Sequence, residues 1–191
     1  MDSMETMTLS ILFLLLAGSS YFDIRYRRIP NWFTFPGMLS GLVLNLAIGG
    51  VSGGLDGLAG LALGMAVLMP FYAFGVMGAG DVKLMGAVGA FLGLKGSFYA
   101  FLAAGVIGGL HAVILLAMNP RHGLTILSNF WTSLKFLFLA GRLYLPNPLE
   151  GAPKQPYGVD IALGGMGYAA WSYMGYASWS QFIAAISSNL I

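Results

Sequence analysis

The sequence predicts an all-α integral membrane protein with six transmembrane helices and one amphipathic helix on the cytosolic membrane face. Of its 191 residues, 58% are hydrophobic and only 8% are charged, and the mean hydropathy is +0.79. Soluble domains carry about 25% charged residues, and a helix needs about 20 apolar residues to cross a bilayer. Uncharged windows of that length recur without an internal repeat or a low-complexity linker, so we expect one polytopic domain over residues 1–191.

Six stretches satisfy, or nearly satisfy, the length that a membrane span requires. The fourth is the weakest, because only eleven uncharged residues separate Lys83 from Lys95, but it can span if both lysines extend toward the head groups. The end of the sixth is open, since no charged residue follows Asp160. The predicted spans are residues 6–22, about 32–48, about 58–74, 83–95, about 97–118, and a last span that begins near Tyr157.

The stretch 124–145 is predicted to lie on the membrane surface. Lys135 stands at its middle, and a central lysine costs about 2.5–3.5 kcal/mol on membrane-insertion scales. On a helix, Lys135 joins Thr125 and Ser128 in a polar stripe opposite a row of leucines and phenylalanines, as in an interfacial helix. The alternative is a seventh span, which would move the C-terminus to the cytosolic side.

The basic residues predict the orientation of the spans, because cytosolic loops are enriched in lysine and arginine. With the N-terminus outside, all nine basic residues except Lys95 fall in cytosolic segments. The first apolar run is preceded by Asp2 and Glu5 and by no basic residue, which favours a retained span over a cleaved signal peptide. We therefore predict a multi-pass membrane protein in contact with the lipid bilayer.

Composition argues against several kinds of partner. Nine basic residues scattered between apolar runs cannot form a stripe that follows phosphates, so no nucleic acid partner is expected. Cysteine is absent and there are only two histidines, so we expect neither a metal site nor a cofactor. The oligomeric state is left open.

Asp23 and Asp81 are the candidate catalytic residues. Each lies at the predicted cytosolic boundary, one after the first span and one before the fourth, where a carboxylate is costly. Two carboxyl groups held together in such a place tend to share one proton. Aspartic proteases use such a pair: one carboxylate takes a proton from the attacking water and its partner acid donates one to the substrate.

Two other interpretations of the aspartates stay open. In a proton-coupled carrier the same pair would relay protons, although a carrier needs a site near the middle of the membrane and usually has internal repeats. In a noncatalytic membrane scaffold both aspartates would be dispensable.

Residues beside the aspartates are candidates for supporting the site or contacting a substrate. Gly78 and Gly80 lack a Cβ, which lets a peptide backbone approach and permits a positive φ. Pro30 fixes φ at the start of the second helix. Lys83 either contacts lipid phosphates or holds Asp81 ionised. Arg25 and Asn31 complete this set, Arg25 within a basic cluster that also serves as a cytosolic anchor.

Three segments, taken in order, resemble the type IV prepilin leader peptidases, the membrane aspartic proteases marked by Gly-x-Gly-Asp. They are residues 23–31 (Asp-Ile-Arg-Tyr-Arg-Arg-Ile-Pro-Asn), residues 78–85 (Gly-Ala-Gly-Asp-Val-Lys-Leu-Met), and Pro156-Tyr157-Gly158 leading into residues 161–164. The resemblance covers about residues 9–171.

The resemblance implies roles, a substrate and a location. It implies that Asp23 and Asp81 are the catalytic pair, with Pro156, Tyr157 and Gly158 supporting the site. The implied substrate is a pilin or pseudopilin precursor with a basic leader and an apolar helix. It would be cut at the cytosolic face of the bacterial inner membrane, typically after a glycine.

The sequence also departs from the larger members of that family. Those members carry an additional cytosolic segment, often with paired cysteines, that is associated with methylating the new N-terminus. Here eight residues separate Arg28 from Gly37 and cysteine is absent, so we expect no N-methyltransferase activity. The size resembles the small peptidases of tight-adherence (Flp-type) pilus systems, which we favour, and the archaeal preflagellin peptidases, which are the alternative.

Three other ionisable residues are expected to have structural roles. Asp160 would stand in the first turn of the last span, where the helix dipole favours an anion, with substrate contact as the alternative. His111 lies in the fifth span among glycines that include Gly105 and Gly109, which indicates tight packing and a neutral, hydrogen-bonded imidazole. The alternative for His111 is a functional role, because ionisable groups within membrane spans often have one. Asp56 is expected to be a solvated loop charge.

Overall fold

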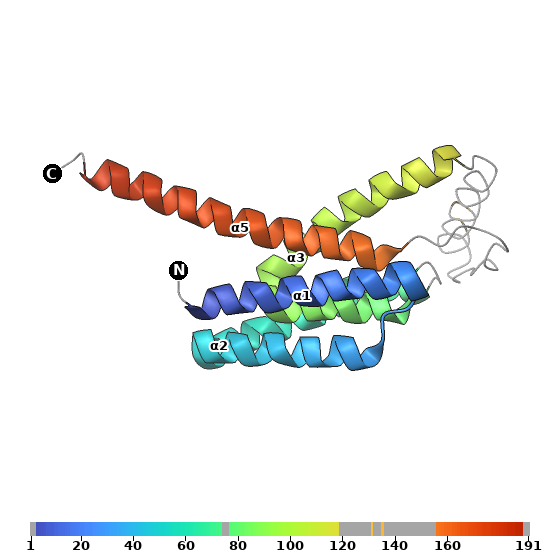
Figure 1. Ribbon diagram of the computed structural model, residues 1–191, viewed down its shortest axis with the longest axis horizontal. Helices are drawn as coiled ribbons and strands as arrows, with labels where there is room; N and C mark the ends of the chain where they lie inside the picture. Colours follow the sequence, from blue (N-terminus) through green and yellow to red (C-terminus); the bar gives the residue numbers. More distant parts are fainter. Residues whose placement is uncertain (1–2, 74–76, 119–130, 132–134, 136–155, 189–191) are drawn as a thin grey trace.

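The protein is built from long helices whose connections gather at one end of the molecule (Figure 1). The computed structural model describes residues 3–73, 77–118, 131, 135 and 156–188, and no strand occurs among them. The principal helices are α1 (Ser3–Tyr26), α2 (Asn31–Ala73), α3 (Ala79–Met118) and α5 (Tyr157–Ser188).

The predicted all-α membrane class is confirmed at the level of these helices. Within the described residues, three helical stretches are long and apolar enough to cross a membrane: Ser3–Tyr26, Asn31–Ala73 and Ala79–Leu115. The predicted surface helix over 124–145 lies, apart from Trp131 and Lys135, outside the described residues.

α2 and α3 each reverse direction at a glycine with a positive φ, which glycine adopts without a steric penalty. Gly50 has φ 59° within α2, and Gly93 has φ 71° within α3. A Cβ on Gly57 would lie 3.2 Å from the Asn45 side-chain nitrogen. Twelve residues of straight helix extend about 18 Å, so this proximity requires the chain to turn back at Gly50.

α3 turns back at Gly93 by the same argument. A Cβ on Gly64 would contact both Met85 and Ser97, which lie before and after Gly93 in the sequence, so the two parts of α3 must lie close together. The predicted second to fifth spans therefore occupy separate helical segments within α2 and α3. The number of membrane crossings stays a prediction.

Neighbouring segments run antiparallel, which gathers their connections at one end. Gly37 of α2 packs against Leu15 of α1, whereas Gly18 packs against Phe33, so the two helices run in opposite directions. Contacts of the same kind show that α5 runs antiparallel to α1, and that the second part of α3 runs antiparallel to α5. We call the resulting end, which contains residues 26–31, residues 77–79 and Tyr157, the connector end (Figure 1).

Small residues let α2 and α3 approach closely, as in membrane helix pairs. A Cβ on Gly89 would contact the Gly60 carbonyl group and would lie 2.9 Å from the Leu61 nitrogen. These are backbone atoms, which cannot rotate away. Elsewhere large side chains point outward, for example Leu14 (72% exposed) and Val106 (74% exposed), as expected for surfaces that face lipid.

We expect Gly89→Ala to destabilise the protein by about 1–3 kcal/mol, because the added methyl group pushes α2 and α3 apart. Gly105→Ala is the matched control, since it lies on the same helix and a Cβ there has nothing within 4 Å. Thermal unfolding in detergent, followed by circular dichroism, compares the two variants. Equal midpoints for the two would contradict the close approach of α2 and α3.

The expectation for Asp56 is wrong in one respect. Asp56 is exposed, as predicted, but it stands within α2 rather than in a loop. Its Oδ1 accepts a hydrogen bond of 3.2 Å from the Leu94 N–H, directly after the reversal at Gly93. The first N–H groups of a helical segment have no partner within that segment, so Asp56 caps the second part of α3.

Candidate active site

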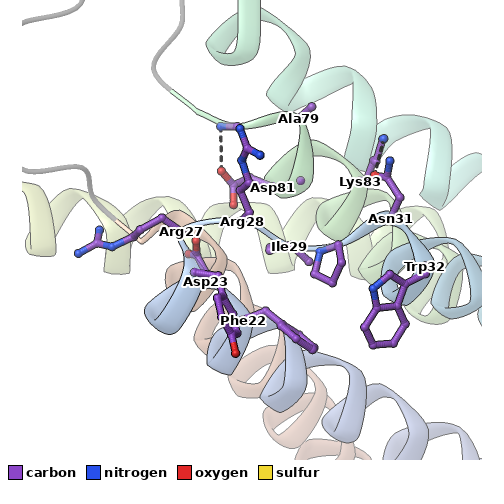
Figure 2. A pocket seen from close by; sticks show the side chains of 14 residues that line it. Phe22, Asp23, Arg27, Arg28, Ile29, Asn31, Trp32, Ala79, Asp81 and Lys83 are labelled. Carbon is purple, nitrogen blue, oxygen red and sulfur yellow. Dashed lines mark hydrogen bonds between the residues drawn. The ribbon is translucent and has the colours of Figure 1, made fainter.

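A cavity of about 680 Å³ opens at the connector end, and both Asp23 and Asp81 line it (Figure 2). Its walls come from the last turn of α1, the connector 27–30, the start of α2 and the segment 78–83. Cavities of about 300–1,000 Å³ are typical of ligand sites. The Asp23 residue is 7% exposed and Asp81 is 8% exposed. We call Asp23 and Asp81 the aspartate pair.

Asp23 is held in place by the N-terminus of α5. It lies in the last turn of α1, on the buried face that also carries Leu16 and Ser19. The Gly158 N–H donates a 2.8 Å hydrogen bond to Asp23 Oδ2. The first N–H groups of a helix lack intrahelical partners, and the helix dipole favours an anion at this end. One carboxyl oxygen of Asp23 is thereby fixed by a residue 135 positions away.

α1 ends at Tyr26, three residues after Asp23, because Arg27 adopts a left-handed conformation with φ 53°. The Arg27 N–H donates a 2.9 Å hydrogen bond to the Asp23 carbonyl, which closes the last turn. The chain then crosses to α2 in residues 28–30. The Pro30 carbonyl accepts hydrogen bonds from the N–H groups of Phe33 and Thr34. These bonds form the first turn of α2, so Pro30 stands at the start of the helix as predicted.

Asp81 stands in the first turn of α3 and is held by its own loop. The Gly78 N–H donates to Asp81 Oδ2 at 2.9 Å, and the Asp81 N–H donates to the Gly78 carbonyl at 3.1 Å (Figure 2). A Cβ on Gly80 would lie 3.2 Å from the Ile29 Cβ. Gly80 thus lets the loop approach the connector 27–30, which carries the chain from Asp23 toward α2.

The expectation that Gly78 and Gly80 allow a positive φ is wrong, because neither residue has one. The glycines are needed here for close approach within the protein itself. The Gly78 position would place a Cβ 3.4 Å from Asp81 Oδ2, and Gly80 faces Ile29.

A third carboxyl group belongs to the surroundings of the aspartate pair. The negative charge of Asp23 acts on the Asp81 carboxyl, and Asp160 of α5 acts on both. Arg27 contributes a positive charge at Asp23. Burial of both side chains, and to a smaller extent the neighbouring like charges, oppose simultaneous ionisation, so the arrangement suits a pair of carboxyl groups that holds one proton between them.

Lys83 lies on the cavity wall but contacts neither aspartate. Its Nζ donates a 2.8 Å hydrogen bond to the Asn31 side-chain oxygen and lies 5.1 Å from the centre of the Phe35 ring. Lys83 and Asn31 therefore join α2 to α3 beside the cavity. Arg25 is exposed and does not line the cavity, unlike its neighbours Arg27 and Arg28.

The predicted segment of residues 156–158 reaches the site through the start of α5. The Pro156 carbonyl accepts a 3.0 Å hydrogen bond from the Val159 N–H. Gly158 contacts Asp23, and a Cβ there would lie 2.9 Å from Asp23 Oδ2. Tyr157 is close enough for the charges of Asp160 and Asp81 to act on its hydroxyl group. The fold thus brings all three predicted segments together.

Sequence reasoning missed the aromatic wall of the cavity. Phe22, Tyr26 and Trp32 line it, and their rings pack with centroids 5.7 Å apart for Phe22 and Trp32 and 6.0 Å apart for Phe22 and Tyr26 (Figure 2). Aromatic residues flanking a charged run were the available signal. Among the described side chains, no group of three or more His, Cys, Asp or Glu is arranged to hold a metal ion.

Comparison with known proteins relates this chain to leader peptidases. The chain is 31% identical over 124 residues to a prepilin leader peptidase/N-methyltransferase of Aeromonas hydrophila and 30% identical to the protein of that name from Aeromonas salmonicida (strain A449). Each match covers 61% of this chain and 42% of the relative, so the chain spans less than half the length of these curated relatives. No solved structure matches the chain.

The family comparison covers the part of the chain that builds most of the cavity. The type IV leader peptidase family matches residues 9–113, which include most of α1, all of α2 and most of α3. Because this match extends over more than half of the sequence, the chain belongs to the type IV leader peptidase family.

Proposed function

We propose that this protein is a membrane-embedded aspartic endopeptidase that removes the basic leader from type IV pilin or pseudopilin precursors of the Flp type. The observation that carries the proposal is the placement of Asp23 and Asp81 in one cavity, each with a carboxyl oxygen held by a backbone N–H. The relatives' printed name, prepilin leader peptidase, supports the class of substrate.

The chemistry needs one ionised and one protonated carboxyl group. The ionised group takes a proton from a water molecule as the water oxygen attacks the scissile carbonyl, while the protonated group donates its proton to the carbonyl oxygen. The tetrahedral intermediate then collapses: the group that is now ionised takes a proton from a hydroxyl group of the intermediate, the C–N bond breaks, and the leaving amine receives a proton from the other carboxyl group. This restores the starting proton distribution, and the atoms of both products come from the substrate and water.

The position of the cavity suits a substrate that is part peptide and part membrane helix. Tyr26 (61% exposed) and Trp32 (68% exposed) form its aromatic edge on α1 and α2, where an apolar helix can lie. The basic residues of the connectors agree with a cytoplasmic location of this end, by the distribution rule for lysine and arginine. We therefore propose cleavage at the cytoplasmic face of the inner membrane.

The carrier interpretation has weaker support. Asp23 and Asp81 both lie at the ends of helices, at the connector end, whereas a proton relay needs groups distributed through the membrane. An archaeal-type preflagellin peptidase would use the same pair and the same chemistry, and differs only in its substrate.

We further propose that the protein does not methylate the new N-terminus. In support, α1 and α2 are joined by the short connector 27–30, and the sequence contains no cysteine. The curated relatives carry both names, prepilin leader peptidase and N-methyltransferase, so the two activities have to be tested separately. The mass of the cleaved product, formed with S-adenosylmethionine present, tests this: an added methyl group would contradict it.

A cleavage assay tests the proposed function. The purified protein, reconstituted in liposomes, is incubated with an Flp-type prepilin, and the products are resolved by mass spectrometry. We expect one cut between the basic leader and the apolar helix. Absence of cleavage by the wild-type protein for a panel of Flp-type, type IV and preflagellin precursors would contradict the proposal.

A further inference from the structure

A polar contact outside the cavity wall joins α3 to α5. His111 Nδ1 lies 3.2 Å from Asp160 Oδ1, and Asp160 stands in the first turn of α5, as predicted. The packing expected around His111 is different. A Cβ on Gly105 or Gly109 would have nothing within 4 Å, whereas a Cβ on Gly108 would lie 3.4 Å from Asp160 Oδ2. The glycine that contacts α5 here is therefore Gly108.

Lys83 of α3 and Asn31 of α2 form a polar contact on the cavity wall itself (Figure 2). The Lys83 Nζ donates a 2.8 Å hydrogen bond to Asn31 Oδ1 and lies 5.1 Å from the centre of the Phe35 ring. Asn31 and Phe35 are four residues apart on α2, so they lie on one face of that helix. A hydrogen bond and a cation–π contact together give the ammonium group a defined position. We call Lys83 and Asn31 the donor pair.

The donor pair presents N–H groups to the cavity. An ammonium group can only donate, so the Asn31 atom that meets Lys83 is the oxygen, and the Asn31 amide nitrogen with its two donors is left for another partner. Two of the three ammonium donors of Lys83 are left in the same way. Within the part of the chain that the structure describes, these two side chains make no further hydrogen bond. The donor pair therefore suits a partner that supplies oxygen acceptors.

The segments that carry the donor pair also carry or contact the aspartate pair. Lys83 follows Asp81 by two residues at the start of α3. Asn31 follows Ile29 by two residues, and a Cβ on Gly80 would lie 3.2 Å from the Ile29 Cβ. All five residues line one cavity. A substrate that reaches the carboxyl groups of the aspartate pair thus passes along the same wall as the donor pair.

A peptide substrate brings oxygen acceptors to this wall. Its scissile segment has to leave the helical conformation, because helical carbonyl groups are already hydrogen-bonded within the helix. The main-chain carbonyl groups of the segment then need donors, since unpaired carbonyl groups in a cavity are costly. Extended peptides are commonly held through such main-chain hydrogen bonds. A basic side chain of the leader has only donors and would be repelled by the Lys83 ammonium group.

We propose that Lys83 and Asn31 are substrate-binding residues that donate hydrogen bonds to main-chain carbonyl groups of the precursor next to the scissile bond. The inference rests on the proposed peptidase function. Donors held at a defined position beside the aspartate pair fix the scissile carbonyl in register with the two carboxyl groups, and such orientation contributes to the rate.

Asn31→Asp separates substrate binding from a purely structural link. The new carboxylate still accepts the hydrogen bond from Lys83, so the connection between α2 and α3 is kept. It loses both amide donors and presents an acceptor to the substrate carbonyl group instead. We expect kcat/KM for prepilin cleavage in liposomes to fall by about 10-fold, with an unchanged thermal midpoint. Each variant is measured at its own pH optimum, because a new carboxylate can shift that optimum.

Lys83→Met tests the other member of the donor pair. Methionine keeps an unbranched side chain beside Phe35 but has no N–H donor. We expect kcat/KM to fall by about 10–100-fold, because hydrogen bonds from charged groups are the stronger ones. Lys95→Met is the matched control, since Lys95 is an exposed lysine of α3 that does not line the cavity, and it should keep the wild-type kcat/KM. The losses should be similar for precursors with different side chains at the cut, because main-chain carbonyl groups are common to all.

The outcomes distinguish this inference from the proposed function. Wild-type kcat/KM in Asn31→Asp would leave the donor pair only a structural link and overturn the inference. Should Asn31→Asp not accumulate, wild-type kcat/KM in Lys83→Met overturns it. A loss that disappears in maltoside detergent, which contains no phosphate, would assign the donor pair to lipid phosphates and also overturn it. A wild-type protein that cleaves no precursor contradicts the proposed function, and the inference falls with it.

Discussion

Asp23→Asn and Asp81→Asn are each expected to lower prepilin cleavage by at least about 1,000-fold. A carboxyl group that transfers protons in the transition state typically contributes 10²–10⁴-fold, and an amide of the same shape cannot do so. Because the two carboxyl groups act as a unit, the double variant should be about as inactive as either single variant. Both variants should still insert and accumulate, since asparagine can accept the same backbone hydrogen bond from Gly158 or Gly78.

The measurement is cleavage of a prepilin in liposomes, with the amount of folded enzyme determined for each variant. Glu5→Gln is the matched change, a carboxyl replaced by its amide on the exposed start of α1. It should retain full activity. Substantial cleavage by both Asp23→Asn and Asp81→Asn would remove the aspartic mechanism.

Gly158→Ala is expected to lower kcat by about 100-fold with little change in stability. The added Cβ would lie 2.9 Å from Asp23 Oδ2 and 2.9 Å from Ile29 Cδ1, so the carboxyl group must move and the 2.8 Å bond from the Gly158 N–H must lengthen. A displacement of about 1 Å in a catalytic group can cost 100-fold in rate. Alanine itself is favourable in a helix, so α5 should still form.

Gly167→Ala provides the control for this effect. It lies on α5 as well, and a Cβ at that position would have nothing within 4 Å. We expect wild-type kcat and KM for this variant in the same liposome assay. Wild-type activity of Gly158→Ala would show that the start of α5 does not position Asp23 for the reaction.

The helices and the two aspartates could be predicted because their signals are local. Apolar runs of span length, interrupted by Arg25–Arg28 and by Lys83, separate the helical segments without reference to any distant residue. Asp23 and Asp81 could also be identified locally, because each is a carboxylate directly beside an apolar run. The prediction that the spans alternate in direction placed both at one end, and the antiparallel segments agree with it.

What the sequence could not indicate depends on contacts between distant residues. The hydrogen bond from Gly158 to Asp23 and the pairing of His111 with Asp160 join helices far apart in the chain. The left-handed conformation of Arg27 is unusual for a residue with a Cβ and carries no sequence signal. The sequence offered Lys83 two partners, lipid phosphates and Asp81. In the folded protein Lys83 instead donates a hydrogen bond to the Asn31 side chain.

Asp56 of α2, which contacts the middle of α3, illustrates the same limit. As an isolated carboxylate near a glycine-rich stretch it resembles a loop charge. Its role as a cap for Leu94 depends on the reversal at Gly93, which brings a free N–H group to it. A sequence shows such a carboxylate but not the N–H group that it will meet.

Cross-linking in the membrane tests the central claim, that Asp23 and Asp81 share one site, most directly. The chain has no native cysteine, so Asp23→Cys combined with Asp81→Cys gives a single thiol pair that a short bismaleimide can bridge. The control combines Asp81→Cys with Asp56→Cys, because Asp56 contacts Leu94, about 20 Å along α3 from Asp81. Mass spectrometry of the digested protein should find the bridge in the first pair and not in the second. A bridge confined to the control pair would contradict the shared site, and with it the proposed aspartic mechanism.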